Sequence, residues 1–497
     1  MNKQRASALL TELSARGLTV RRLVNDSRRV QPGDVFVAYP GAKVDGRLFI
    51  NEVIQAGAVA VLVEAAGFDV PPCAVPLLPV LGLKALSGAL AAELLGDPSS
   101  HLRLIGVTGT NGKTSITQWI ANALAKVGQR CALIGTLGNG FPGALDESVN
   151  TTPDAFALQS LLSDFLNEGA VACAMEVSSI GLDQERCAAS QFSTAVFTNL
   201  TRDHLDYHGT MQAYAAAKAR LFVWPGLRSV VINIDDPFGL ELLASTSAVN
   251  IYVYSLAPAL CVPIANAVLL QAKNIEDDSD GIYFDLLVDG RSYPVNAPVI
   301  GHYNVANLLA LAGTLLAEGV SEAALPGLLG AVVSVPGRMQ RLGGAGVPLV
   351  AVDYAHTPDA LRNALNALRP SARQRGGNLV CIFGCGGDRD SGKRPLMGAV
   401  ATQLADIVWL TSDNPRSEDP ANILAEIAAG AEGGAWLEVD RRLAITQVIG
   451  QCTERDVVLL AGKGHETYQE VQGKKWPYSD ELVVNAALAL WRAEAAR

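Results

Sequence analysis

The chain has 497 residues, about three times the length of an average domain, and 49% of them are hydrophobic while 18% are charged. This composition excludes a disordered chain and leaves apolar material for several cores. The formal net charge of −10, without a basic tail, argues against a protein that coats nucleic acid.

The chain shows no targeting or membrane signal. Its first residues lack the uninterrupted apolar segment and the cleavage site of a signal peptide, so we expect a cytoplasmic protein. The most apolar long stretch, 77–96, contains Lys84 and Glu93, which argues against a membrane span and favours a packed helix. The eight cysteines include no CxxC pair and are interpreted as buried, reduced thiols.

The first two segments of the chain alternate between strand and helix patterns. The first, to about residue 99, contains strand patterns at 35–40 and 58–65 before a helical stretch. The second has predicted strands at 104–107, 171–179, 193–200 and 229–234, and predicted helices at 114–126 and 154–169. Such alternation predicts parallel βαβ units. A hairpin at 281–295, a helix at 304–318 and a linker at 333–341 are predicted to follow.

The third segment predicts a doubly wound parallel sheet. Its predicted strands are 349–355, 378–384, 406–412 and 456–462, and its predicted helices are 359–368, 394–404 and 420–430. Polar clusters follow these strands, namely DYAHTPD, GCGGDRDSGKR, SDNPRSEDP and GKGHE. Ligands bind at the carboxyl ends of the strands in such sheets, so these clusters predict a binding site.

The alternation predicts an α/β protein of three domains. We place a small α/β domain at 1–99, a P-loop ATPase-like domain with a parallel sheet at 100–335, and a Rossmann-like, doubly wound domain at 336–497.

A glycine-rich segment, GVTGTNGKTS at 106–115, follows a predicted strand and opens a predicted helix. Backbone N–H groups at such a turn bind phosphate, Lys113 would reach the β and γ phosphates, and the Thr114 hydroxyl would ligate magnesium. The strict P-loop pattern requires glycine where this chain has Val107. A structural glycine-rich turn is the alternative.

Three further residues could contribute to a metal site or to catalysis. Glu176 ends one predicted strand and His204 follows another, at the same sheet edge as the glycine-rich loop. Their alternatives are a helix cap and an ordinary loop histidine. Lys218 lies among small apolar residues, where burial would lower its pKa and yield a neutral amine; a solvated helix lysine is the alternative.

Two polar groups could recognise ligands. The first is rich in hydroxyls, suits a carboxylate or sugar, and comprises Asn150, Thr151, Thr152, Ser178, Gln184 and Arg186. In the second, Arg416 follows Asp413 and Asn414, with Glu466 expected at a neighbouring strand end, and could hold an amino acid by its carboxylate and ammonium. The alternatives are ordinary loop residues and a loop-stabilising ion pair.

Through these motifs and their order, the chain resembles the Mur ligases over essentially its whole length. The Mur ligases are ATP-dependent amide-forming enzymes of peptidoglycan synthesis. The matching motifs are GTNGKT (109–114), NTT (150–152), EVSS (176–179), NLTRDHLDYHG (199–209), GHYNVAN (301–307) and DYAHTPD (353–359). Within the family, DNPR at 413–416 resembles members that add meso-diaminopimelate.

The resemblance implies a role for each site residue. ATP would contact Gly109, Thr110, Asn111, Gly112, Lys113, Thr114, Ser115, Asn304 and Asp353. Magnesium would be held by Thr114, Glu176, His204 and a carbamylated Lys218. The UDP-MurNAc-dipeptide would contact Asn25, Ser27, Ala42, Lys43, Val44, Asn150, Thr151, Thr152, Ser178, Gln184 and Arg186. Diaminopimelate would contact Arg389, Asp413, Asn414, Pro415, Arg416, Gly462 and Glu466.

The resemblance also implies a reaction and its partners. ATP would phosphorylate the D-Glu γ-carboxylate of UDP-MurNAc-L-Ala-D-Glu, and the diaminopimelate amine would displace phosphate from the acyl phosphate. A monomer that binds neither nucleic acid nor membrane is expected. Many relatives place histidine after EVSS, where this chain has Ile180, so no histidine role transfers to that position.

Two other functions fit part of the pattern. A folylpolyglutamate-type ligase would share the ATP loop, but the first domain and DNPR argue against it. A nucleotide-binding switch would leave DNPR and GKGHE without a role, and nucleotide-dependent partner binding without diaminopimelate-dependent ADP release would favour it.

Overall fold

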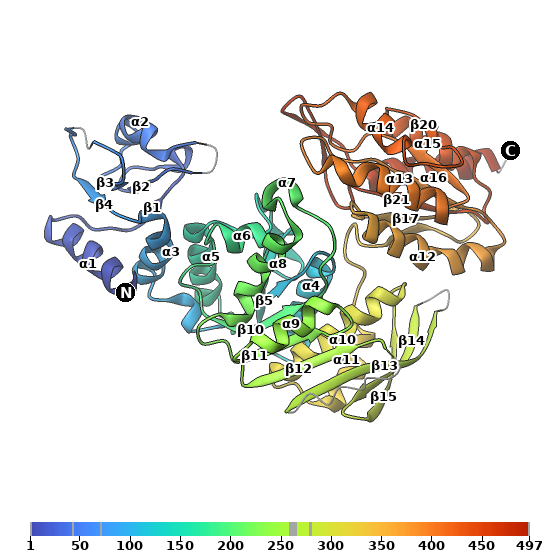
Figure 1. The fold of residues 1–497 in the computed structure, drawn as a ribbon, viewed down its shortest axis with the longest axis horizontal. Helices are drawn as coiled ribbons and strands as arrows, with labels where there is room; N and C mark the ends of the chain where they lie inside the picture. Colours follow the sequence, from blue (N-terminus) through green and yellow to red (C-terminus); the bar gives the residue numbers. More distant parts are fainter. Residues whose placement is uncertain (1, 42–43, 70–71, 258–265, 278–280, 496–497) are drawn as a thin grey trace. The chain divides into compact units, whose positions relative to one another are not determined.

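Figure 1 shows the computed structural model, which describes residues 2–41, 44–69, 72–257, 266–277 and 281–495. The chain forms two compact units. The first comprises residues 1–107, 127–195 and 220–228, and the second comprises residues 108–126, 196–219 and 229–497. Strands alternate with helices in both, which confirms the predicted α/β class. The domain boundaries at residues 99 and 335 remain predictions.

The first unit begins with a four-stranded parallel sheet in the order β1-β2-β3-β4. Its strands are β1 (Leu23–Val24), β2 (Val35–Ala38), β3 (Ala60–Glu64) and β4 (Leu77–Val80), and its helices are α1 (Asn2–Ala15), α2 (Ile50–Gln55) and α3 (Leu83–Leu94). Side chains of β2 alternate between two cores: Val35 and Val37 pack with α1 and α3, and Phe36 packs with α2. The predicted helix at 77–96 is wrong in its first residues, which form β4 because a strand pairs there with β3.

The rest of the first unit contains the strands that lead to the glycine-rich loop. Strand β9 (Ala172–Glu176) lies between β5 (Arg103–Thr108) and β6 (Cys131–Gly135), and all three are parallel. Strands β7 (Gly138–Phe141) and β8 (Ala144–Asp146) extend β6 in antiparallel fashion. Helices α5 (Ala155–Asn167) and α6 (Ser179–Asp183) and strand β10 (Phe192–Phe197) follow. The sequence reasoning missed β6, β7 and β8.

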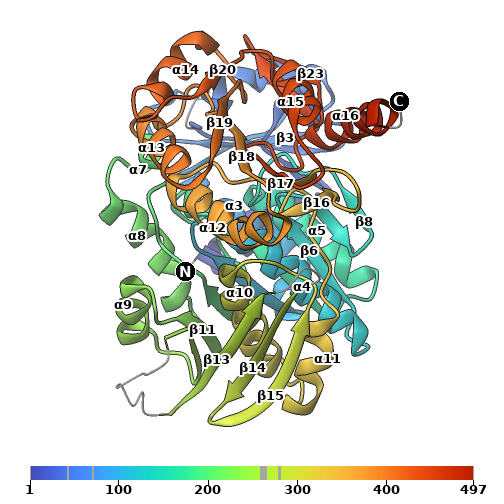
Figure 2. The same cartoon turned by 90° about the vertical axis from the view of Figure 1, so that its right-hand side faces the viewer.

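The second unit begins with α4 (Lys113–Lys126), the helix that follows the glycine-rich loop. Strands β11 (Ser229–Asn233), β12 (Asn250–Ser255) and β13 (Ala267–Asp277) pair in parallel, and β14 (Ile282–Val288) and β15 (Arg291–Ala297) complete an antiparallel ribbon (Figure 2). Helix α10 (His302–Ala317) packs against β11, β12, β13 and α4. The remaining helices before residue 333 are α7 (Leu205–His208), α8 (Met211–Ala219), α9 (Pro237–Ser245) and α11 (Leu325–Gly330).

Residues 340–495 form a six-stranded sheet in the order β16-β17-β21-β18-β19-β20. Its strands are β16 (Gln340–Gly343), β17 (Leu349–Asp353), β18 (Leu379–Phe383), β19 (Ile407–Leu410), β20 (Trp436–Leu437) and β21 (Val457–Ala461). Helices α12 (Pro358–Arg375), α13 (Arg394–Leu404) and α14 (Pro420–Ala428) cover one face, and α15 (Arg441–Gln451) and α16 (Asp480–Ala495) cover the other (Figure 2). The doubly wound fold is confirmed.

Several details of this region differ from the sequence predictions. The edge strand β16 is antiparallel to β17, so the sheet is not purely parallel, and the predicted linker at 333–341 ends inside β16. Helix α12 continues past Pro370 to Arg375. A hairpin, β22 (Tyr468–Val471) and β23 (Lys474–Pro477), was missed because its side chains are largely exposed and show no apolar period.

Two composition-based predictions can be compared with the structure. Among the described helices, none combines the length and apolarity that crossing a membrane requires. All cysteines outside the undescribed Cys261 are free thiols, and most are buried, but Cys73 and Cys452 are partly exposed, contrary to the prediction for those two. Burial raises the pKa of the Cys187 and Cys385 thiols to about 12, which keeps them protonated.

Candidate functional site

The glycine-rich loop between β5 and α4 is fixed by the loop that follows β10. The backbone N–H groups of Thr110 and Asn111 donate to the backbone oxygen and to Oδ1 of Asn199, at 2.8 and 2.9 Å. Gly109 has φ +146°, and a Cβ there would lie 1.8 Å from Thr198 Oγ1. Glycine at 109 is therefore required both by the backbone conformation and by the close approach of the second loop.

Lys113 and Thr114 begin helix α4 with their functional groups directed at defined partners. The Nζ of Lys113 donates to the backbone oxygens of Gly109 and Thr110, each at 2.9 Å. The Thr114 hydroxyl accepts a hydrogen bond from Arg338 Nη2 at 2.9 Å. The loop thus presents an ammonium, a hydroxyl and a guanidinium at the start of a helix, where the helix dipole also favours anions.

Lys218 on α8 is buried, which the predicted lowering of its pKa requires. Its side chain is 1% exposed, Nζ donates to the Gly109 oxygen at 2.8 Å, and the ammonium lies 4.5 Å from the centre of the Tyr214 ring. Burial and the nearby charge of Lys113 hold the pKa of Lys218 well below its ordinary value. The solvated-lysine alternative is therefore wrong.

His204 lies beside the same loop and is neutral at pH 7. Burial, together with the charges of Lys113 and Lys218, lowers its pKa to about 4 despite the carboxylate of Asp203. Asp203 lies between two imidazoles, with its Oδ2 3.5 Å from Nε2 of both His204 and His356. A neutral imidazole can ligate a metal ion.

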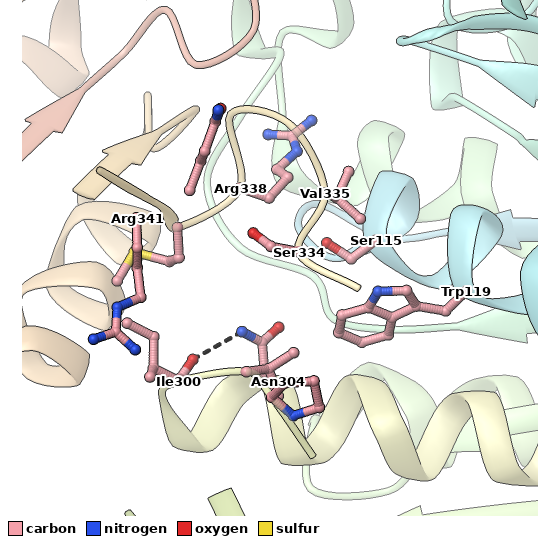
Figure 3. A pocket seen from close by; sticks show the side chains of 12 residues that line it. Ser115, Trp119, Ile300, Asn304, Ser334, Val335, Arg338 and Arg341 are labelled. Carbon is pink, nitrogen blue, oxygen red and sulfur yellow. Dashed lines mark hydrogen bonds between the residues drawn. The ribbon is translucent and has the colours of Figure 1, made fainter. Parts of the chain in front are cut away.

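A cavity of about 170 Å³ lies beside the start of α4 (Figure 3). Its lining comprises Ser115, Trp119, Pro298, Val299, Ile300, Asn304, Ser334, Val335, Arg338, Met339, Gln340 and Arg341. Asn304 Nδ2 donates to the Ile300 oxygen at 2.8 Å, and Asp353 Oδ2 accepts the Met339 N–H at 2.7 Å. The cavity therefore brings together the predicted residues Ser115 and Asn304, with Asp353 supporting one wall.

The predicted hydroxyl-rich group converges within the first unit. Thr152 Oγ1 donates to the Glu176 backbone oxygen at 2.8 Å and accepts the Ser178 N–H at 2.9 Å. Arg186 Nη1 donates to the Thr152 oxygen, and Arg186 Nη2 donates to Gln184 Oε1, both at 2.8 Å. Loops that are distant in sequence thus form one polar cluster. Asn150 belongs to the same turn and accepts from the Ser148 hydroxyl through its backbone oxygen.

Glu176 ends β9 in register with Val107 of β5, which is the predicted sheet edge. Its side chain is 1% exposed, and its carboxylate accepts from Thr136 N at 2.8 Å and from Thr136 Oγ1 at 3.0 Å. Thr136 Oγ1 also lies 3.0 Å from Thr151 Oγ1. The Glu176 carboxylate is therefore held rigidly; its role toward a metal remains a prediction.

The predicted contacts of the first sheet region are only partly described. Asn25 Nδ2 donates to the Tyr39 hydroxyl at 3.0 Å, and Ser27 begins a short 3-10 helix that Asp26 caps. Val44 is exposed. Ala42 and Lys43 lie outside the described residues.

The polar clusters after β19 and β21 meet, as the sheet topology predicts. Asn414 Nδ2 donates to Glu466 Oε2 at 2.8 Å. Gly462 has φ +112°, and a Cβ there would lie 2.5 Å from Asp413 Oδ2. Pro415 is buried, and its backbone oxygen would lie 2.0 Å from a Cβ at Gly387. The loops that follow β18, β19 and β21 are therefore packed so closely that only glycine fits at positions 387 and 462.

Arg416 contacts a carboxylate that the sequence reasoning did not name. Its Nη1 donates to the Gly387 oxygen at 2.7 Å, and its Nε lies 3.4 Å from Glu470 Oε2. The hairpin β22–β23, which brings Glu470 there, has no apolar pattern by which sequence could place it. Arg389 is half-exposed and lies 3.6 Å from Asp206 Oδ2.

Sequence reasoning missed three residues that organise these sites. Arg338 and Trp119 line the cavity, and Lys463 is buried between Asn414 and Glu466. The signal for Arg338 was its basic side chain within a glycine- and proline-containing segment, which was interpreted only as a linker. In the described part of the chain, no three His, Cys, Asp or Glu side chains form a ready metal site.

Comparisons with known proteins agree with this geometry. Residues 19–94, 107–315 and 337–464 match the models of the Mur ligase family catalytic domain, the Mur ligase middle domain and the Mur ligase glutamate ligase domain. The UDP-N-acetylmuramoyl-L-alanyl-D-glutamate--2,6-diaminopimelate ligases of Pseudomonas syringae pv. tomato and Pseudomonas aeruginosa are each 50% identical to this chain, over 96% of both sequences.

Solved structures show the same architecture. A solved structure of a UDP-N-acetylmuramoyl-L-alanyl-D-glutamate--2,6-diaminopimelate ligase is 37% identical to this chain and has a TM-score of 0.66. The match covers 95% of this chain and 95% of that one. MurF ligase from Thermotoga maritima in complex with ADP is 19% identical with a TM-score of 0.65, covers 96% of this chain and 98% of that one, and shows the fold alone. On these matches, the chain belongs to the Mur ligase family, with its three-domain α/β architecture.

Proposed function

We propose that this chain joins meso-diaminopimelate to the γ-carboxylate of D-Glu in UDP-MurNAc-L-Ala-D-Glu, with cleavage of ATP to ADP and phosphate. The observation that carries the proposal is the meeting of two loops in the last sheet. Arg416, a guanidinium fork, lies in the same loop as Asn414, which is bonded to the Glu466 carboxylate. This combination suits an amino-acid end that carries both a carboxylate and an ammonium. The names of relatives at 50% identity include 2,6-diaminopimelate.

ATP is assigned to the glycine-rich loop and the cavity beside it. Residues Gly109 to Gly112 lead directly into α4, which begins at Lys113, so phosphates bound there meet backbone N–H groups, Lys113 and the helix dipole. The cavity supplies an apolar wall from Trp119 and an amide from Asn304, which suits a purine base. Arg338 spans the two parts, because it lines the cavity and donates to Thr114.

The donors around the glycine-rich loop fit a magnesium ion bound with the phosphates. The Thr114 hydroxyl and the neutral His204 imidazole are suitable donor types. The lowered pKa of the buried Lys218 amine favours its neutral form, which can add CO2 and release a proton to give a carbamate oxygen donor. When bound, magnesium neutralises charge on the phosphates during transfer. Glu176 belongs to the other compact unit, and we retain it as a candidate ligand on sequence grounds.

The sugar-peptide substrate is assigned to the cluster around Thr152, Ser178 and Arg186. Arg186 already satisfies the Thr152 oxygen and Gln184, so its guanidinium has a fixed direction. The γ-carboxylate of the substrate takes the terminal phosphoryl group of ATP, and ADP leaves. The diaminopimelate amine then attacks the acyl carbon, phosphate leaves with the electrons of the C–O bond, and the amine loses a proton. Lys113 and Arg338 place positive charge where the transferring phosphoryl group accumulates negative charge.

The test is ADP release by the purified chain with ATP, magnesium and UDP-MurNAc-L-Ala-D-Glu, with meso-diaminopimelate, L-lysine or no amino acid, followed by mass analysis of the product. We expect turnover and a tripeptide product with diaminopimelate only. Arg416→Lys serves as a matched variant, because lysine keeps the charge but loses the planar fork.

Each result of this experiment discriminates between functions. A preference for lysine in the unchanged chain would retain the ligase but remove the role given to Arg416. If no product forms with either amino acid and the chain binds a protein partner in a nucleotide-dependent way, the nucleotide switch is favoured. Glutamate addition to a folate substrate would favour a folylpolyglutamate-type ligase.

A further inference from the structure

Lys463 is a buried cation at the centre of the loops that follow β19 and β21. Its side chain is 0% exposed. The ammonium donates to Asn414 Oδ1 at 3.0 Å and to Glu466 Oε2 at 2.9 Å, and it lies 5.8 Å from the centre of the Tyr468 ring. A buried ammonium is tolerated only when it is paired and hydrogen-bonded, and here its polar partners are two residues of the amino-acid pocket.

The contact with Lys463 determines which way the Asn414 amide faces. Asn414 Oδ1 accepts from Lys463 Nζ and from the backbone N–H of Glu470, at 3.0 and 2.9 Å. A flipped amide would direct its NH2 group at two donors, so the observed orientation is the only one that satisfies the hydrogen bonds. That orientation directs Asn414 Nδ2 at Glu466 Oε2.

The Glu466 carboxylate is oriented by the same cation. Its Oε2 receives hydrogen bonds from both Lys463 and Asn414, at 2.9 and 2.8 Å. An ionised carboxylate has about four lone-pair sites, so these two bonds fix the group and leave acceptor capacity for a ligand ammonium. The 17% exposed side chain of Glu466 has the access that Lys463 lacks.

We propose that Lys463 is a positioning residue for the diaminopimelate pocket. It fixes the directions of the Asn414 amide and the Glu466 carboxylate and compensates the charge of Glu466, without touching the amino acid itself. The proposal rests on the proposed assignment of Glu466 and Asn414 to diaminopimelate.

The main test compares Lys463→Met with Glu466→Gln and with their double variant. Methionine preserves much of the side-chain volume while removing the ammonium. We expect the KM for meso-diaminopimelate to rise about tenfold or more, because Asn414 and Glu466 lose a charged donor, while the KM values for ATP and UDP-MurNAc-L-Ala-D-Glu change by less than about twofold. In the Glu466→Gln background, the additional effect of Lys463→Met is expected to be much smaller.

A matched control is Lys475→Met. Lys475 is exposed, and its Nζ lies 4.0 Å from the centre of the same Tyr468 ring. The variant therefore removes a cation beside that ring without affecting Asn414 or Glu466. We expect all three KM values to be unchanged. Thermal unfolding of each variant reports folding, and Lys463→Gln, which retains an N–H donor, replaces Lys463→Met if the latter does not fold.

The outcomes separate the inference from the function on which it rests. If Glu466→Gln raises the KM for diaminopimelate and the Lys463 variants do not, the positioning role is wrong and the pocket assignment stands. If neither raises it, the assignment of Glu466 is wrong and the inference falls with it. If the Lys463 variants raise the KM values for diaminopimelate, ATP and UDP-MurNAc-L-Ala-D-Glu equally, Lys463 has a purely structural role and the proposal is wrong.

Discussion

Arg338 Nη2 donates a hydrogen bond of 2.9 Å to the hydroxyl oxygen of Thr114, the second residue of helix α4. The same guanidinium lies 4.5 Å from the centre of the Tyr354 ring, which packs against His465 of the GKGHE cluster. Arg338 therefore connects the glycine-rich loop to the loops of the last sheet. A planar guanidinium can bond and stack at the same time, which lysine cannot do.

Arg338→Lys is expected to lower kcat/KM for ATP by about tenfold or more, because it removes a directional donor and a stacked cation beside the proposed phosphate site. Steady-state kinetics with ATP varied measure the effect. Arg373→Lys, an exposed change near the end of α12, is the control and should have no effect. Equal kinetics for the two variants would contradict the role of Arg338.

Lys218 is expected to carry a carbamate in the active protein, because burial and the charge of Lys113 lower the pKa of its amine and so favour the neutral, nucleophilic form. Protein equilibrated with 13C-bicarbonate should show a carbamate carbonyl signal by 13C NMR. Lys218→Arg should lose both the signal and most of the activity, since a guanidinium stays protonated. An active protein without the signal would refute carbamylation.

Asp480→Asn is expected to destabilise the region that contains the six-stranded sheet, residues 340–495, by about 3–5 kcal/mol, because it leaves the buried guanidinium of Arg441 without its carboxylate. The two side chains are fully buried and bonded at 2.7 and 2.8 Å, and Arg441 also donates to the Ala461 oxygen just before GKGHE. The midpoint of urea unfolding measures the effect.

Two further variants make this comparison quantitative. The double change Arg441→Met with Asp480→Leu should recover much of the loss, since it removes both charges. Glu12→Gln breaks a half-exposed pair with Arg16 and should cost less than about 1 kcal/mol. An Asp480→Asn variant as stable as the parent would show that the pair is not needed.

Asp456→Asn is expected to lower the free energy of unfolding at neutral pH and to have a smaller effect at acidic pH. Burial tends to raise the pKa of Asp456, but hydrogen bonds from the backbone N–H groups of Asn378 and Thr453 outweigh it and lower the pKa below its ordinary value. Stability from such a carboxylate is present above its unfolded pKa and is lost as pH falls through the folded pKa.

The measurement is the unfolding temperature of the parent and the Asp456→Asn variant from pH 7 down to pH 3. The parent should be more stable near pH 7, by about 1–2 kcal/mol, and the difference should shrink below pH 4. A difference that stays constant across this range would show that ionisation of Asp456 contributes nothing.

The sequence alone determined the α/β alternation, several of the central strands, and the motifs at strand ends. Strong local signals carried this information: apolar runs for β5, β17 and β21, and a glycine-rich turn before α4. Because parallel strands end at one sheet edge, the sequence also predicted that DNPR and GKGHE would meet, and Asn414 does bond to Glu466.

Which side chains became partners depended on the folded arrangement of the loops. Lys218 is buried against Gly109, a residue 109 positions away in the sequence that no local pattern could bring to it, and so a solvated lysine remained possible. Arg416 pairs with Glu470 because a polar hairpin without an apolar period folds back beside it. Lys463 and Arg338 acquire their roles from contacts between loops, and such contacts depend on chain topology, whereas periodicity reports only which face of an element is buried.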